Sequence, residues 1–96
     1  MLNLDREQPA GQIFGRQQHW SCGRAKVLVS FSDDEDRCAV FISNAPDGSG
    51  EGLLFTELGL SERPGFTLEP SIDCFAIGCP VNALDDLLSR LAARLA

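Results

Sequence analysis

Two segments, residues 26–32 and 37–43, place an apolar side chain at every second position on either side of four consecutive acids at residues 33–36. A period of two is typical of β-strands, and the acids between them predict a hairpin loop centred between Asp34 and Glu35. The apolar pairs aligned by this register are Phe31 with Cys38, Val29 with Val40 and Val27 with Ile42. A shift by one residue would mix the two faces. The loop therefore has four residues, and because it lacks glycine we expect it to be built on a type I turn.

The other face of this hairpin is mixed rather than polar. It carries Lys26, Leu28, Ser30, Ala39, Phe41 and Ser43. A fully solvated face would be polar at nearly every position, so we expect this face to be half covered.

The carboxyl-terminal residues follow a helical period instead. The apolar positions form one stripe and are Leu84, Leu87, Leu88, Leu91, Ala92 and Leu95. Asn82 is a suitable N-cap, Asp85 and Asp86 place negative charge in the first turn, and Arg90 and Arg94 place positive charge late. We expect this amphipathic helix to cover one face of the domain's own sheet. The alternative is a seam between two copies of the chain.

Turn residues divide the remainder of the chain. The predicted segments are a polar amino-terminal arm (1–12), a short edge strand (12–16), a turn or strand (17–21), one or two helical turns (53–60) and two strands (66–69 and 72–77). Gly59 suits the left-handed end of the short helix, and Pro64 followed by Gly65 predicts a type II turn. We therefore expect an α+β fold with an antiparallel sheet of four to five strands and the carboxyl-terminal helix packed on one face, within a single domain of residues 13–96.

The amino terminus also carries a resemblance. Leu2-Asn-Leu-Asp-Arg6, followed by Pro9, Gly11, Ile13 and Gly15, resembles the openings of small accessory proteins encoded by phages and plasmids. The resemblance covers residues 2–15 and implies no particular chemistry.

The charge of the chain disfavours partners that are themselves negatively charged. The 96 residues carry a net charge of −6 and a pI near 4.5, so binding to nucleic acid or to an anionic membrane would act against the protein's own field. The start of the chain lacks a cationic, apolar signal peptide, and no segment reaches the roughly 20 apolar residues of a membrane span. We expect a cytoplasmic protein whose four cysteines are reduced.

Catalytic signatures are absent from the sequence. His19 is the single histidine, and although Cys22 is three residues away, no orienting third group accompanies the pair. No phosphate-binding loop, dinucleotide fingerprint or nucleophile elbow is present. The sequence predicts a non-enzymatic protein without catalytic residues or cofactors.

Two sets of residues resemble metal ligands without matching a full site. His19 with Cys22, and Cys74 with Cys79, are the candidate zinc pairs, but the second pair lies in an apolar run rather than a glycine-rich knuckle. Asp47, Ser49 and Glu51 match early positions of a calcium-binding EF-hand loop, whereas the twelfth position is a leucine. We expect no bound metal, and buried cysteines are the simpler interpretation.

The acidic turn remains the feature that packing does not explain. It is either a solvated turn that discourages aggregation, or a negative surface for a partner protein with a basic surface. Trp20, Phe14 and Phe41 are candidate apolar anchors for such a contact, and the alternative for Trp20 is a place in the core. The candidate partner-binding residues are Asp33, Asp34, Glu35, Asp36, Asp47, Glu51 and Trp20.

The function expected from these features is that of a small acidic protein-binding module. It is inhibitor-like, as in immunity proteins, antitoxins and phage-encoded inhibitors, and acts as a monomer or as a homodimer through the carboxyl-terminal helix. The alternatives are an assembly protein of a mobile element and a small acidic export chaperone.

Overall fold

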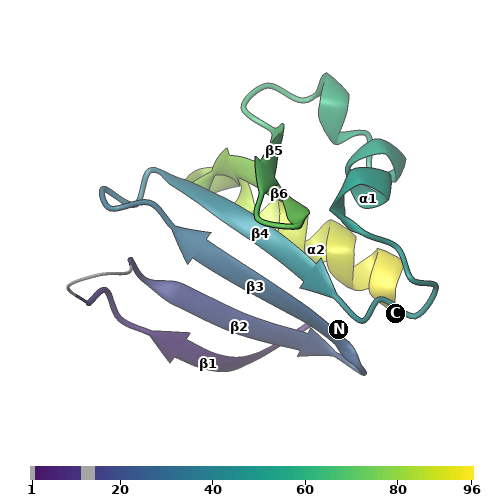
Figure 1. Ribbon diagram of the computed structural model, residues 1–96, viewed down its shortest axis with the longest axis horizontal. Helices are drawn as coiled ribbons and strands as arrows, with labels where there is room; N and C mark the ends of the chain where they lie inside the picture. Colours follow the sequence, from purple (N-terminus) through teal and green to yellow (C-terminus); the bar gives the residue numbers. More distant parts are fainter. Residues whose placement is uncertain (1, 12–14) are drawn as a thin grey trace.

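A computed structural model describes residues 2–11 and 15–96 of the chain. Within these residues the fold is one sheet of six antiparallel strands in the order β1-β2-β3-β4-β6-β5 (Figure 1). The strands are β1 (Asn3–Gln8), β2 (Gln17–Cys22), β3 (Ala25–Phe31), β4 (Arg37–Ser43), β5 (Thr67–Ser71) and β6 (Cys74–Pro80). The α+β class is confirmed, whereas the expected four to five strands are too few.

The extra strand is β1, which the sequence placed in an arm. Asn3–Gln8 pairs with β2 along the sheet edge, with a bulge between Leu4 and Arg6. All six residues of β1 are exposed. Because both faces of this strand meet water, its sequence carries no alternation, and the period-two signal failed here. The edge strand expected over residues 12–16 lies largely outside the described residues, and so does the candidate anchor Phe14. The division of the chain at residue 12 remains a prediction.

The central hairpin has the predicted register. Phe31 lies opposite Cys38, and Val29 lies opposite Val40. Alternate residues of β3 are buried, beginning with Ala25 and ending with Phe31. The apolar pairing of the two strands therefore sets which side of the sheet faces the core.

Two helices follow in the described residues, α1 (Glu51–Glu57) and α2 (Leu84–Leu95), each adjoined by a short 3₁₀ turn, η1 (Leu60–Glu62) and η2 (Val81–Ala83). α2 packs on one face of the sheet, and α1 lies beside β5 and β6 (Figure 1). The leucines of the stripe are all buried: Leu84, Leu87, Leu88, Leu91 and Leu95. The predicted cap is wrong, because Ala83 holds the N-cap position and Asn82 belongs to the preceding 3₁₀ turn.

The connections around α1 follow the expected turn chemistry. Gly59 has φ +69° after the last turn of α1, as its left-handed position requires. Gly65 has φ +85°, and the Phe66 amide donates to the Arg63 carbonyl at 3.3 Å, as expected of a type II turn.

The following hairpin turns later than the sequence indicated. β5 continues through Pro70 and Ser71, and the turn is made by Ile72 and Asp73, which has φ +59°. A proline was expected to end the strand, but β5 is at the edge of the sheet, where the missing amide hydrogen leaves no ladder bond unmade.

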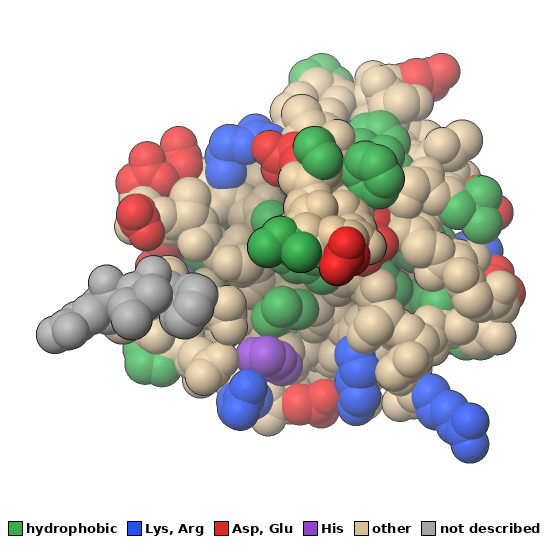
Figure 2. Space-filling view, in the orientation of Figure 1, with side chains coloured by type: hydrophobic (Ala, Val, Ile, Leu, Met, Phe, Trp, Pro, Cys, Tyr) green, Lys and Arg blue, Asp and Glu red, His purple; other side chains and the backbone are tan. Residues whose placement is uncertain are grey.

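The two faces of the sheet differ. Residues from one face join α1 and α2 in a single core, which includes Val29, Val40, Ile77, Leu54 and Leu91. On the opposite side, here called the open face, Leu28, Ala39 and Phe41 are half-buried, which confirms the expected partial cover. Figure 2 looks onto this face, where hydrophobic side chains lie among charged ones. None of the helices in residues 2–11 and 15–96 is long and apolar enough to cross a membrane.

Candidate partner-binding site

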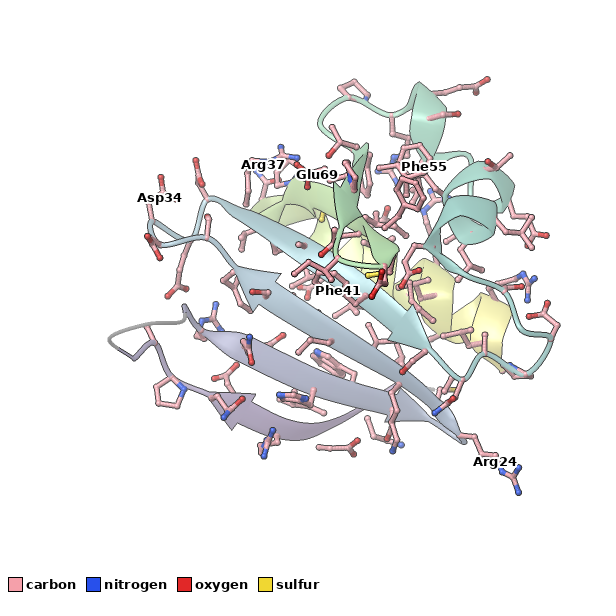
Figure 3. All side chains as sticks on the ribbon, in the orientation of Figure 1. Arg24, Asp34, Arg37, Phe41, Phe55 and Glu69 are labelled. Atoms are coloured by element: carbon pink, nitrogen blue, oxygen red, sulfur yellow. The ribbon has the colours of Figure 1, made fainter. Side chains whose placement is uncertain are left out.

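The acidic tip, defined as Asp33 to Asp36, projects from one end of the sheet (Figure 3). The tip is closed by hydrogen bonds at its base: the Ser32 amide donates to the Arg37 carbonyl at 2.9 Å, and the Glu35 amide donates to the Ser32 carbonyl at 2.9 Å. Glu35 then has φ +55°, which lets the strand resume at Arg37. The predicted four-residue loop is confirmed, and its backbone is held in one shape.

The hydroxyl of Ser32 organises the acids above it. Its Oγ lies 3.0 Å from Asp34 Oδ1 and 3.1 Å from Asp36 Oδ1, and it accepts the Arg37 amide hydrogen at 3.2 Å. The contact with the Asp36 side chain, and then the hydrogen bond from the Ser32 hydroxyl, hold the pKa of Asp34 below its ordinary value. The carboxylates are therefore oriented without any cation among them.

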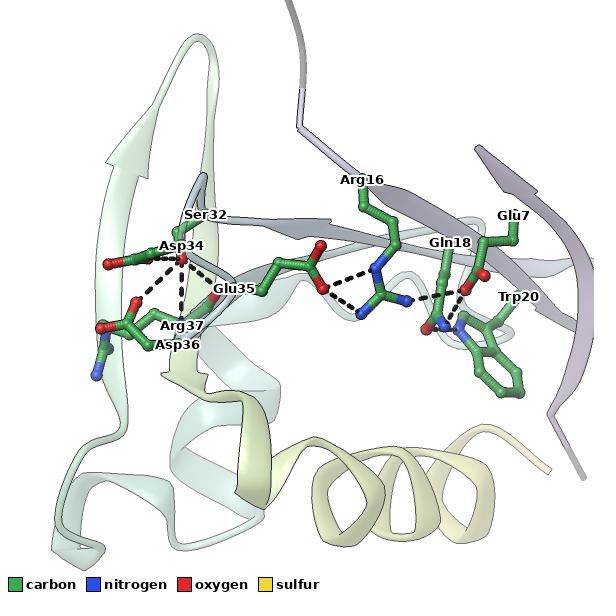
Figure 4. A network of polar contacts seen from close by, with 9 residues as sticks. All are labelled: Glu7, Arg16, Gln18, Trp20, Ser32, Asp34, Glu35, Asp36 and Arg37. Carbon is green, nitrogen blue, oxygen red and sulfur yellow. Dashed lines mark hydrogen bonds and ion pairs between the residues drawn. The ribbon is translucent and has the colours of Figure 1, made fainter. Parts of the chain in front are cut away.

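Glu35 differs from its neighbours because its side chain points toward Arg16 and not into solvent beyond the tip. Arg16 Nη2 lies 2.9 Å from Glu35 Oε1, and Arg16 Nη1 lies 3.0 Å from Glu7 Oε2 (Figure 4). The guanidinium also stacks 3.8 Å from the centre of the Phe31 ring. The hydrogen bond to Glu35, followed by the attraction of both acids, raises the pKa of Arg16. Glu35 is thus neutralised, whereas Asp33, Asp34 and Asp36 form no ion pair with any residue that the structure describes.

Trp20 belongs to this network but not to the tip surface. Its Nε1 donates to Gln18 Oε1 at 3.1 Å, and Gln18 donates to Glu7 at 2.6 Å (Figure 4). Trp20 lies opposite Val27 in the sheet and packs against the core. Its ring therefore stabilises the helix-covered side and is not placed beside the acids.

Asp47 and Glu51 lie at the other end of β4 from the tip. The seven residues of β4 separate the two groups by about 20 Å at the rise of a strand. Asp47 is bound by Arg94, with Nη2 2.6 Å from Oδ2, and by the Ser49 hydroxyl at 2.5 Å. These partners, Ser49 first, hold the pKa of Asp47 well below its ordinary range. The structure does not bring Asp47 to the tip.

Glu51 has a structural use. It is 9% exposed, and its Oε1 accepts the backbone amide hydrogen of Ile42 at 2.8 Å. The ladder between β4 and β6 ends at Val40, so the carboxylate replaces a strand partner for Ile42. Of the six predicted acidic site residues, the three aspartates of the tip are the ones left free for a partner.

The open face adds a groove that sequence reasoning did not identify. The groove has a volume of about 570 Å³, and half-buried Leu28 and Phe41 line it. Arg6, His19 and Lys26 line it as well, and Arg6 Nη2 lies 3.2 Å from His19 Nε2. The strand pattern had marked Leu28 and Phe41, but the contribution of β1 and β2 depended on strand order. Phe41 lies between the acidic Asp34 end and the basic Arg24 end of this face (Figure 3).

The candidate metal pairs are divided between the faces of the sheet. His19 and Cys22 are three apart on β2, and Cys74 and Cys79 are five apart on β6, so each odd spacing points the two side chains in opposite directions. No three His, Cys, Asp or Glu side chains of the described chain gather in a metal-binding arrangement. The odd spacings are visible in the sequence, but they exclude paired ligands only once both segments are known to be strands.

Comparisons with known proteins add no relative: no family model matches the sequence, no curated protein matches it, and no solved structure matches its fold. Function is therefore inferred from the surfaces of the molecule itself.

Proposed function

We propose that this chain is a small non-enzymatic protein-binding module of the inhibitor type, which docks on a basic surface of a partner protein through its acidic tip. The supporting observation is that Asp33, Asp34 and Asp36 are exposed, lack cationic partners in the described chain, and stand on a loop closed by hydrogen bonds. A held array of charges binds with less loss of conformational entropy than a mobile one.

We expect the charge at the tip to act mainly on the rate of association with the partner. A negative surface on a protein of net charge −6 steers a basic partner toward it and raises the association rate at low ionic strength. Durable binding also needs apolar contact, which the tip lacks. Phe41 and Leu28 of the open face supply the large half-buried apolar side chains of the same sheet hairpin.

The test compares two variants of equal charge. Asp33→Asn with Asp34→Asn removes two of the three unpaired charges of the tip, and Glu62→Gln with Asp85→Asn removes two exposed charges elsewhere. Each protein is immobilised and exposed to extract of the native host, and the captured protein is then purified for rate measurements across a salt series. We expect the tip variant alone to associate about tenfold more slowly at low salt, with the difference vanishing at high salt.

Two results would contradict the proposal. One is an equal reduction of the association rate in both variants, which would reflect net charge alone. The other is a wild-type association rate in the tip variant at low salt, which would make the acids a solvated turn.

The export-chaperone alternative is favoured by a different observation, the groove over Leu28 and Phe41. A chaperone of this kind would hold an extended apolar segment on the open face. Phe41→Ser distinguishes the two functions, because it should abolish capture by a chaperone but chiefly increase the dissociation rate of an inhibitor complex. Wild-type dissociation in Phe41→Ser would remove the open face from either function.

The assembly alternative has less support. The edge strand β1 is interrupted by a bulge, and Pro70 lies within the opposite edge strand β5, two features that hinder strand-to-strand association. The leucine stripe of α2 is used inside the domain, where its members are at most 7% exposed. A dimer through that stripe would require the leucines to leave the core.

A further inference from the structure

Cys38 and Cys79 occupy directly opposite positions on the adjacent strands β4 and β6. Both side chains are buried, and their Sγ atoms are 3.5 Å apart. Opposite residues of antiparallel strands have Cα atoms about 4.5 to 5.5 Å apart, within the span of about 4.4 to 6.8 Å that disulfides bridge. We propose that Cys38 and Cys79 are a modification site, a dithiol that a small two-electron thiol oxidant converts into an intramolecular disulfide.

The other cysteines are poorly placed to compete. Cys22 is on β2, two strands or about 10 Å across the sheet from Cys38. It also lies at the other end of the strands, because it pairs with Ala25 whereas Cys38 pairs with Phe31, six residues or about 20 Å further along β3. Cys74 shares β6 with Cys79 but is exposed, and the odd spacing turns it to the other face. Among the cysteines of the described chain, Cys38 and Cys79 are therefore the pair whose sulfur atoms lie close enough to form a disulfide.

The contact between the thiols also assigns their roles. The contact between the two Sγ atoms lowers the pKa of Cys79, whereas the same contact, followed by burial, raises the pKa of Cys38. Since the thiolate is the nucleophile, the lower pKa favours Cys79 as the sulfur that attacks the oxidant first.

Diamide, a small azo compound, is a suitable probe because it accepts two electrons and two protons. The Cys79 thiolate forms an S–N bond to one azo nitrogen, and the other nitrogen takes up a proton. The Cys38 sulfur then loses its proton and attacks the Cys79 sulfur, so that an S–S bond forms, the S–N bond breaks and the hydrazine leaves with the second proton. The two thiols are oxidised and the azo group is reduced.

The disulfide would lie between β4 and β6, close to the start of η2. Arg37 and Pro80, the next pair along, flank the Cys38–Cys79 position. The Val81 amide donates to the Asp36 carbonyl at 3.0 Å, so the base of the tip already contacts the start of η2. A covalent link at Cys38 would hold this junction closed and would restrict the unfolded chain over the 40 residues between the cysteines.

The experiment uses the full chain carrying Cys74→Ser, which removes the exposed thiol. We expect diamide to lower the intact mass by about 2 Da and to raise the Tm by at least about 5 °C, both reversed by dithiothreitol. Cleavage after glutamate separates Cys38, in residues 36–51, from Cys79, in residues 63–96, because the bond between Glu69 and Pro70 resists cleavage. Without reductant, these two peptides should remain joined.

The matched control adds Cys79→Ala to the same background and should keep its mass in diamide. A link from Cys22 to either cysteine, an unchanged mass, or a lower Tm on oxidation would overturn the proposal. The peptide map of the Cys74→Ser protein decides the linkage even if the control variant fails to fold.

Discussion

Two acidic segments of this chain were both predicted to bind a partner, and the structure uses them differently. One is the tip, and the other contains Asp47 and Glu51 at the opposite end of β4. At the tip, Glu35 alone is paired with a cation, whereas Asp47 is bound by Arg94 and Glu51 is buried against the Ile42 amide. The comparison teaches that an acid can bind a partner only if it is neither paired with a cation nor buried within the protein's own fold.

The largest effect should follow the loss of the buried carboxylate. Glu51→Ala leaves the Ile42 amide without its acceptor, and we expect it to lower the free energy of unfolding by about 1 to 3 kcal/mol. Glu51→Gln keeps an acceptor oxygen and is the matched control. Urea unfolding of both variants makes the measurement, and equal stability of Glu51→Ala and wild type would show that the segment is as free as the tip.

A smaller effect should appear in acid. The pKa of Asp47 is lower in the folded protein than its ordinary value of 3.8, so unfolding takes up a proton as the pH falls below about 4. The stability that Asp47 contributes is therefore complete above that pH and is lost at lower pH. We expect Asp47→Asn to make the unfolding midpoint fall less steeply between pH 4 and pH 2, followed by circular dichroism in urea. Parallel curves for the two proteins would contradict a contribution of the Asp47 carboxylate to stability.

The smallest effect on stability is expected at the tip. Neutralising Asp33 and Asp34 removes no ion pair formed within the described chain, and asparagine can still accept from Ser32. The urea midpoint should stay at the wild-type value or rise slightly as repulsion between the acids decreases. A clear loss of stability would show that the tip, like the other segment, serves the fold.

Sequence patterns predicted the elements whose two faces differ in solvent exposure. The hairpin of β3 and β4 and the leucine stripe of α2 have one buried face each, so period and register could be read directly. β1 is exposed throughout, and its sequence had no such signal. Asn82 failed as a cap because a 3₁₀ turn precedes α2, a choice made by the connection to β6 rather than by the helix itself.

The candidate site divides in the same way. Exposure of Asp33, Asp34 and Asp36 could be inferred from the loop alone, since a turn between two paired strands projects into solvent. Neither the partners of Asp47 and Glu51 nor the groove over Phe41 could be inferred, because Arg94, Ile42 and Arg6 reach them from other elements.

By itself, the sequence determined the local pairing of β3 with β4, the buried stripe of α2 and the position of four acids in one turn. Only the tertiary structure decided which acids stay unpaired, that β6 lies beside β4, and that Cys38 meets Cys79. The physical reason is the separation in sequence over which each interaction acts. Periodicity and turn chemistry act between neighbours in the chain, whereas neutralisation of a charge or contact of two thiols depends on residues that long loops bring together.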